Sequence, residues 1–179
     1  MAGAPALLIV SGPPGAGKTS VARRLAETSP APAVHLRFDD FLHAIRSGFV
    51  EPWLPQSRAQ NAVVTRAFAG AGAVYAGAGY AVVLDGVVGP WFLDIYRDAA
   101  RAIGADLDYA VLLPERAVAV ARARGRDADP LSPYPPRIFD GFADMAQFSA
   151  HVLDTTSMSI EAAASIVREG CAAGRFRLR

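Results

Sequence analysis

Short, almost wholly apolar runs alternate along the chain with longer segments in which apolar residues recur every three or four positions. The runs Ala6–Val10 and Asp108–Leu113 are typical of strands that are buried on both faces of a sheet. The segments Thr19–Glu27 and Arg58–Tyr75 have the period of a helix with one apolar face. Strands that alternate with helices predict an α/β fold, in which helices cover both faces of a parallel sheet.

The other segments continue this alternation. The 179 residues suit one domain, and neither a repeat nor a long linker divides them, so we expect a single domain over residues 1–179. A Pro-rich stretch within residues 122–137 is expected to form a lid. The further predicted strands are Ala33–Phe38, Tyr80–Leu84 and one within "HVLDTT", and the further predicted helices are "DDFLHAIRSG" with Gly48 as its stop, Trp91–Ile103, Arg116–Arg124, Ile138–Phe148 and Ile160–Arg168.

The charges of the chain are nearly balanced, which argues against one class of partner. There are 18 Lys and Arg residues against 17 Asp and Glu residues, whereas nucleic-acid-binding domains are typically strongly basic. No run approaches the ~20 apolar residues of a membrane span, and the single cysteine, Cys171, permits no internal disulfide. We therefore expect a cytoplasmic protein, a monomer or a homodimer, that binds neither nucleic acid nor membrane.

The stretch "GPPGAGKT" satisfies the motif G-x-x-x-x-G-K-[ST] in full, directly after a predicted strand and before a predicted helix. Its glycines allow backbone N–H groups to turn inward around phosphates. Lys18 is the only lysine among 18 basic residues, which fits a narrow cradle that requires a compact point charge. We predict that ATP binds here with Mg²⁺, with Lys18 at the β- and γ-phosphates and Thr19 at the metal. The predicted nucleotide-binding residues are Gly12, Pro13, Pro14, Gly15, Ala16, Gly17, Lys18, Thr19 and Ser20.

Acidic residues follow two of the predicted strands, at the edge of the sheet where ligands of open α/β folds bind. Asp85 is predicted to support Mg²⁺ directly or through water, and the alternative is a turn-forming Asp-Gly pair. Asp39 and Asp40 in "LRFDDF" are predicted to contact the acceptor, where one carboxylate could act as a general base on a hydroxyl. The alternative is that one of them only caps the following helix.

The stretch "ARARGR" places three arginines at a helix end that leads into the Pro-rich stretch. Arg122, Arg124 and Arg126 could neutralise charge on a phosphoryl group during its transfer. The helix dipole alone would also favour arginine at this position. We predict a functional role for at least one of them.

The segment "EPWLPQSRAQN" combines two prolines, a flat apolar side chain and several polar ones, as specific small-molecule pockets do. Trp53, Gln56 and Asn61 are predicted to contact the acceptor. Alternatively, Trp53 only anchors a loop to the core. The three histidines lack the spacing of metal ligands and are expected to be structural: His35, His43 and His151.

Together with "LDTTSMSIEAAASIV", these motifs resemble the small P-loop kinases, and most closely the chloramphenicol phosphotransferase-like group and neighbouring bacterial ATP-binding proteins. The resemblance extends from Leu7 to Val167. It implies a five-stranded parallel sheet of order 2-3-1-4-5, with adenine held between the lid arginines and the loop at Thr155–Ser157, where Thr156 is the expected contact. It also implies that Asp39 is the catalytic base. The stretch Phe49–Asn61 departs from chloramphenicol phosphotransferase, so the resemblance does not extend to chloramphenicol as the substrate.

These features predict an enzyme. We expect a P-loop kinase that moves the γ-phosphoryl group of ATP to a hydroxyl of a small molecule, such as an antibiotic, a sugar-like compound or another metabolite. The alternative is a nucleotide-dependent switch or ATPase that acts through contacts with other proteins. The residues expected to act in transfer are Lys18, Asp39, Arg122 and Arg126.

Overall fold

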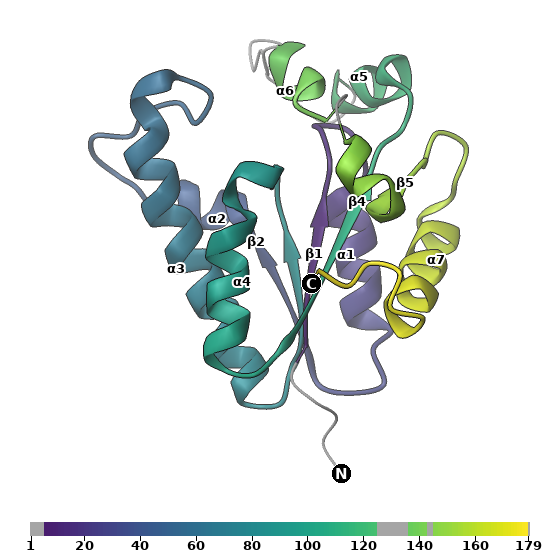
Figure 1. The fold of residues 1–179 in the computed structure, drawn as a ribbon. Helices are drawn as coiled ribbons and strands as arrows, with labels where there is room; N and C mark the ends of the chain where they lie inside the picture. Colours follow the sequence, from purple (N-terminus) through teal and green to yellow (C-terminus); the bar gives the residue numbers. More distant parts are fainter. Residues whose placement is uncertain (1–5, 125–135, 143–144, 179) are drawn as a thin grey trace.

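The computed structural model describes residues 6–124, 136–142 and 145–178. A five-stranded parallel sheet runs through its centre in the order β2-β3-β1-β4-β5, so the predicted order is confirmed (Figure 1). The central strand, β1, pairs with β3 on one side and with β4 on the other. The strands are β1 (Ala6–Ser11), β2 (Ala33–Arg37), β3 (Ala81–Asp85), β4 (Asp106–Leu112) and β5 (Val152–Leu153).

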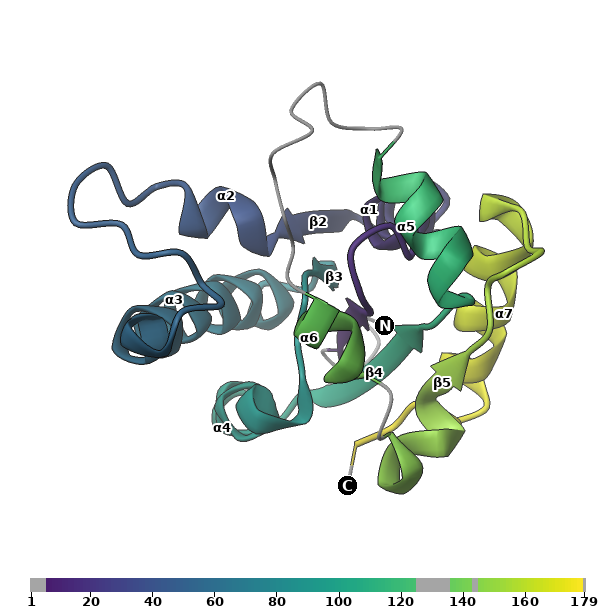
Figure 2. The ribbon, with the colours of Figure 1, turned by 90° about the horizontal axis from the view of Figure 1, so that it is seen from above.

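Helices connect the strands and cover both faces of the sheet, as the apolar patterns predict. Helices α1 and α7 lie on one face, and α3 and α4 lie on the other (Figure 2). The helices are α1 (Lys18–Glu27), α2 (Phe38–Leu42), α3 (Arg58–Gly77), α4 (Leu93–Ala102), α5 (Arg116–Arg124), α6 (Pro136–Asp140) and α7 (Ile160–Ala172), with 3₁₀ segments at Pro55–Ser57, Pro90–Phe92 and Ala146–His151.

Each face of the sheet has its own apolar core. On the face covered by α3 and α4, the rings of Phe68, Tyr96 and Tyr109 are fully buried. On the face covered by α1 and α7, Leu25 and Val167 are among the buried side chains. Because the middle strands contribute side chains to both cores, their sequences are apolar at nearly every position.

The second strand and the helix after it are both shorter than predicted. β2 ends at Arg37, and Phe38 begins α2 instead of ending the strand. The ring of Phe38 packs edge to face against Phe68 of α3, with 5.4 Å between centroids, so its apolar character serves helix packing. α2 ends at Leu42 and not near Gly48, because the residues between them are mostly exposed and offer no apolar face that would continue the helix.

The single helix predicted over Ile138–Phe148 is also wrong. Two shorter elements take its place: α6, which ends at Asp140, and the 3₁₀ segment Ala146–His151. Phe142, which follows α6, is completely buried in the core next to α3 and α4. The chain turns at this point because Phe142 packs inward.

The segment after α7 forms a contact that the sequence did not reveal. Arg177 makes an antiparallel bridge with Asp108 of β4, and its guanidinium lies 2.6 Å from Asp106 and 3.1 Å from Asp108. Burial raises the pKa of Asp108, although hydrogen bonding and charge from Arg177 act in the opposite direction. The backbone N–H of Tyr109 donates to the carbonyl oxygen of Phe176 at 2.8 Å. The chain end is thereby attached to the sheet.

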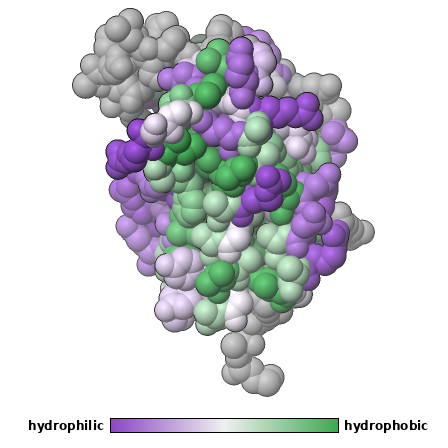
Figure 3. Space-filling model, turned by 90° about the vertical axis from the view of Figure 1, so that its left-hand side faces the viewer, coloured by the Kyte–Doolittle hydropathy of each residue, from purple (hydrophilic) through white to green (hydrophobic). Residues whose placement is uncertain are grey.

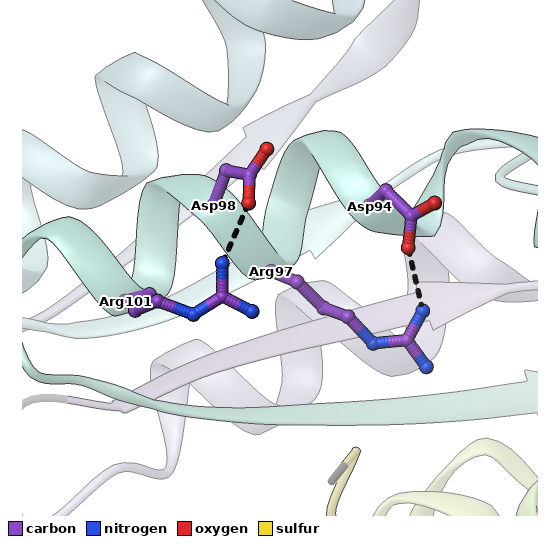
Figure 4. A network of polar contacts seen from close by, with 4 residues as sticks. All are labelled: Asp94, Arg97, Asp98 and Arg101. Carbon is purple, nitrogen blue, oxygen red and sulfur yellow. Dashed lines mark hydrogen bonds and ion pairs between the residues drawn. The ribbon is translucent and has the colours of Figure 1, made fainter.

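Helix α4 carries two ion pairs on its outer surface, each between residues three positions apart (Figure 4). Nη1 of Arg97 lies 3.0 Å from Oδ1 of Asp94, and Nη1 of Arg101 lies 2.8 Å from Oδ1 of Asp98. Both carboxylates are largely exposed, so these pairs contribute little to stability. The helix is held mainly by its inner face, where Tyr96 is buried.

Helix α3 carries apolar side chains on its outer face as well as on its inner one. Figure 3 views the side of the molecule on which α3 lies and shows apolar side chains gathered there among polar ones. Val63 and Val74 of α3 are 59% and 73% exposed. Even so, no helix in the described part of the chain is long and apolar enough to cross a membrane.

Candidate functional site

The loop between β1 and α1 follows a path that only glycine permits at two positions. Gly12 has a φ of 142°, and a Cβ there would lie 2.1 Å from the carbonyl oxygen of Leu112 in β4. Gly15 has a φ of 75°, and a Cβ there would lie 1.9 Å from the carbonyl oxygen of Ala119 in α5. The loop is therefore packed closely between β4 and α5. Its glycine backbone, placed before a helix, fits a phosphate group.

Lys18 and Thr19 begin α1, directly after Gly17, which has a left-handed backbone. Nζ of Lys18 donates to the carbonyl oxygen of Pro13 at 3.0 Å, so the ammonium group bends back onto the loop that precedes it. The N-terminus of this ten-residue helix adds positive potential at the same place. The arrangement can hold an anion such as the polyphosphate of a nucleotide.

Asp85 ends β3 and lies between the ends of two neighbouring strands, in register with Val10 of β1 and Arg37 of β2. Its side chain is 4% exposed, and its Oδ2 lies 3.3 Å from Nε2 of His35 in β2. A buried carboxylate requires a polar partner, which His35 supplies. The sequence had not revealed this contact.

Thr19 and Asp85 line the same cavity and offer one hydroxyl and one carboxylate. Within the described residues, no group of three or more His, Cys, Asp and Glu side chains could hold a metal ion by itself. Mg²⁺ needs no such group, because it takes oxygen ligands, retains several waters and shares substrate phosphates. The residues present therefore fit a Mg²⁺ ion that arrives with a nucleotide.

A buried hydrogen-bond network fixes the loop after β3. Oγ of Ser11 donates to the carbonyl oxygen of Val88 at 2.7 Å and accepts from the backbone N–H of Val88 at 3.0 Å. The hydroxyl of Tyr109 donates to the same carbonyl at 2.7 Å, and burial raises the pKa of Tyr109, so the group remains a donor. The end of β1 thus positions the loop that leads to Trp91.

The loop between β1 and α1, residues 12–17, is called the phosphate loop below. It opens into a cavity of about 470 Å³ at the carboxyl ends of β2 and β3. Figure 2 views this end of the sheet from above, with the loop near the centre, α2 and α3 on one side and α5 on the other. The cavity brings together residues that are far apart in the sequence. The predicted site residues that line it are Pro14, Gly15, Lys18, Thr19, Asp39, Trp53, Asn61 and Asp85.

Asp39 and Asp40 both lie in the first turn of α2, but of the two only Asp39 lines the cavity. The side chain of Asp40 is 63% exposed and lies 3.6 Å from Nη1 of Arg37. Arg37 is the N-cap residue of α2 and makes no side-chain cap bond, so neither aspartate takes the capping position. Of this pair, Asp39 is therefore the one that shares the cavity with Lys18 and Asp85.

The segment "EPWLPQSRAQN" supplies three further predicted contacts to the acceptor, and the structure does not bring all of them together. Trp53 and Asn61 line the cavity, whereas Gln56 is exposed and does not. Nδ2 of Asn61 donates to the carbonyl oxygen of Pro52 at 2.7 Å and to Oγ of Ser57 at 2.9 Å. Asn61 thus holds the loop that carries Trp53.

Arg122 reaches from α5 to the loop after β5. Its guanidinium donates to the carbonyl oxygens of Thr155 at 3.3 Å and Thr156 at 3.0 Å. Oγ1 of Thr156 accepts from the backbone N–H of Glu115 at 2.8 Å. These bonds join α5 to the loop that the family resemblance assigns to adenine, and Arg122 does not line the cavity with Asp39. Outside the described residues lie Arg126, most of the predicted lid and the side chain of Arg124.

The sequence patterns did not identify several other side chains that line the cavity, among them Arg37, Trp91, Phe92 and Tyr96. Trp91 and Phe92 follow a strand end, and ligands of open α/β sheets bind off strand ends, so this signal could have identified them. Tyr96 offers no such signal, because its spacing on α4 is that of a core residue.

Comparisons with known proteins agree with this fold. A family model described as an AAA domain matches residues 7–165, while the chain matches no curated protein in a sequence comparison. The tunicamycin resistance protein of Deinococcus radiodurans is similar in structure at 19% identity and a TM-score of 0.66, over 97% of this chain and 98% of that one. The APS kinase of Mycobacterium tuberculosis in complex with AMPPNP and APS is similar at 18% identity and a TM-score of 0.63, over 94% of this chain and 98% of that one. The shikimate kinase of Acinetobacter baumannii in complex with shikimate is similar at 18% identity and a TM-score of 0.60, over 97% of this chain and 96% of that one.

Proposed function

Because the chain belongs to the AAA domain family and has the fold of the small P-loop kinases, we propose that it transfers the γ-phosphoryl group of ATP to a hydroxyl of a small molecule. One observation carries this proposal. The cavity that contains Lys18 and Thr19, directly after the phosphate loop, is also lined by Trp53 and Trp91, and its volume of about 470 Å³ suits a small molecule. A switch that acts through protein contacts would not need an aromatic pocket beside its nucleotide phosphates.

The phosphate loop and the two residues after it bind the nucleotide in this proposal. Lys18 exchanges its hydrogen bond to Pro13 for contacts with phosphate oxygens. Thr19 and Asp85 hold Mg²⁺, with Asp85 oriented by His35. Bound ATP would supply the phosphoryl group, and the Mg²⁺ ion would neutralise part of the charge on the phosphate oxygens. The chain's own contribution is to position these groups in a fixed geometry.

Asp39 acts on the acceptor in this proposal. Its carboxylate lines the cavity together with Lys18 and can accept the proton of the attacking hydroxyl. Trp53 and Trp91 provide apolar surface on which the acceptor would bind, and the bound acceptor would displace water from the cavity, which favours transfer over hydrolysis. Arg122 and Thr156 form part of the wall for adenine.

The likeness to kinases supports the reaction class and leaves the acceptor open. The structural neighbours carry names as different as tunicamycin resistance protein, APS kinase and shikimate kinase. The acceptor of this chain must therefore be inferred from its own cavity.

An ATP-consumption assay tests the proposal. The purified protein with Mg·ATP should hydrolyse ATP slowly by itself, and a compound with a suitable hydroxyl should raise the rate and be recovered with a phosphoryl group attached. Fast hydrolysis that no alcohol accelerates would instead support an ATPase or switch.

A further inference from the structure

Two buried polar atoms in the wall of the cavity have no hydrogen-bond partner among the described residues: the hydroxyl of Tyr96 and Oδ1 of Asn61. Buried polar atoms are nearly always hydrogen-bonded, and an unsatisfied one costs free energy. Both residues face a space that can hold a small molecule. A bound molecule that reaches these atoms from the cavity could satisfy them.

The orientation of the Asn61 amide is determined by its neighbours. The carbonyl oxygen of Pro52 can only accept a hydrogen bond, so the group that lies 2.7 Å from it must be the amide nitrogen. The same nitrogen donates to Oγ of Ser57. Oδ1 is thus left as an acceptor that a donor group of a ligand could satisfy.

The hydroxyl of Tyr96 provides the complementary group. The side chain is only 2% exposed, and its ring meets Phe68 edge to face with 6.3 Å between centroids. Burial raises the pKa of Tyr96 far above its usual value, so the hydroxyl keeps its proton and can donate. A ligand in the cavity that carries a hydrogen-bond acceptor could use this donor.

The charges on the described lining residues of the cavity disfavour an anionic acceptor. Besides Lys18, directly after the phosphate loop, Arg37 is the only cation among the described lining residues. Its side chain is 46% exposed and paired with Asp40, and the carboxylate of Asp39 lies in the same cavity. No buried cation of the described lining is thus left over for a carboxylate or phosphate of the acceptor. The remaining wall is mostly apolar and aromatic, with Trp53, Trp91, Phe92, Leu42 and Val87.

We infer that the acceptor is an uncharged alcohol with a flat apolar body, and that the hydroxyl of Tyr96 and Oδ1 of Asn61 recognise its polar groups. The inference rests on the proposed function, which it deepens by naming the substrate class. Tyr96 gives the cleaner test of the two, because Asn61 also holds the loop of Trp53 through Pro52 and Ser57.

Tryptophan fluorescence offers a direct measure of binding, because the only two tryptophans of the chain, Trp53 and Trp91, both line the cavity. Ring-bearing alcohols such as 1-phenyl-1,2-ethanediol would be titrated beside carboxylate counterparts such as mandelate. Mg·AMPPNP would be present so that Lys18 is engaged. We expect the uncharged compounds to bind at least about tenfold more tightly than their charged counterparts.

The variant Tyr96→Phe removes the hydroxyl and keeps the ring. It should weaken binding of the uncharged compounds about 5- to 20-fold. It should unfold at an unchanged or higher temperature, because an unsatisfied buried hydroxyl is lost. Tyr80→Phe is the matched control: Tyr80 is 39% exposed and lies outside the cavity lining, so its variant should bind as the parent does.

Several outcomes would overturn the inference. They are equal or tighter binding of the carboxylates, no binding of either set, unchanged binding by Tyr96→Phe, or a lower unfolding temperature for that variant, which would give the hydroxyl a structural role. The inference and the proposed function fail in different ways. Uncharged alcohols that bind through Tyr96 but never receive a phosphoryl group contradict only the kinase proposal, whereas phosphorylation confined to anionic alcohols contradicts only the inference.

Discussion

The imidazole of His35 contacts the buried carboxylate of Asp85, with 3.3 Å between Nε2 and Oδ2. The two residues lie on neighbouring strands, β2 and β3, whose carboxyl ends meet beside the phosphate loop. His35 does not line the cavity, so it can act on a ligand only through Asp85. We therefore regard His35 as a positioning residue for the proposed metal ligand.

Loss of this contact should weaken the response to Mg²⁺. His35→Ala removes the partner of Asp85, and we expect the Mg²⁺ concentration for half-maximal nucleotide binding to rise about tenfold. His35→Gln retains a donor of similar reach and should recover most of the loss. Calorimetric titration of nucleotide at several Mg²⁺ concentrations measures the Mg²⁺ dependence of each variant. Equal Mg²⁺ dependence in His35→Ala and the parent would contradict the positioning role.

Lys18 should be required for nucleotide binding but not for folding. Lys18→Ala removes the charge that bends back to Pro13, and we expect a large loss of ATP affinity and of turnover with little change in the unfolding temperature. Arg23→Ala, a change at an exposed position of the same helix, is the control and should bind ATP normally. Unchanged Mg·ATP binding by Lys18→Ala in calorimetry would refute the phosphate-cradle assignment.

Asp39 and Asp40 offer a matched pair of variants. Asp39→Asn keeps the shape and removes the proton acceptor, so transfer to an identified acceptor should fall about 10²–10⁴-fold while ATP affinity changes little. Asp40→Asn should retain most of the transfer rate, because Asp40 is exposed and outside the cavity lining. Single-turnover rates of both variants decide the assignment. A loss confined to Asp40→Asn would identify the other member of the pair as the base.

Cys171 should react slowly in the folded protein. Burial, with a smaller effect of the Asp108 carboxylate, raises the pKa of its thiol from 9.0 to about 12. At pH 8 the thiolate fraction is then about 10³-fold lower than in the unfolded chain, and alkylation by iodoacetamide should slow accordingly.

The raised pKa of Cys171 also affects stability, because above pH 9 the unfolded thiol loses a proton that the folded one keeps. The Cys171 contribution to stability should therefore fall between pH 9 and 12, and Cys171→Ala should remove that part of the pH dependence.

The sheet and most of the helices could be predicted because their signals are local. Runs apolar at every position identify strands that are buried on both faces, and the helix over Arg116–Arg124 has the predicted bounds. The failures have tertiary causes. Phe38 looks like the end of a strand, but its ring packs on α3, and Phe142 interrupts a helical pattern because it packs into the core.

The candidate site was predictable only in part, for a related reason. The phosphate loop is contiguous, and its glycines, Lys18 and Thr19 form a recognisable pattern. The acceptor side is assembled from α2, the Trp53 loop, α3 and α4, and no spacing in the sequence reveals that Tyr96 meets the same cavity as Asn61. The contact of His35 with Asp85 joins residues 50 positions apart and gives no local signal.

Whether the γ-phosphoryl group of ATP reaches an alcohol or water decides between a small-molecule kinase and an ATPase. ATP labelled in that group would be incubated with Mg²⁺, the protein and alcohols that change its tryptophan fluorescence, and the products would be separated. We predict that the label appears in the alcohol, that Lys18→Ala abolishes this transfer, and that little label appears as inorganic phosphate. Label that appears only as inorganic phosphate, at a rate that no bound alcohol changes, would contradict the assignment as a small-molecule kinase.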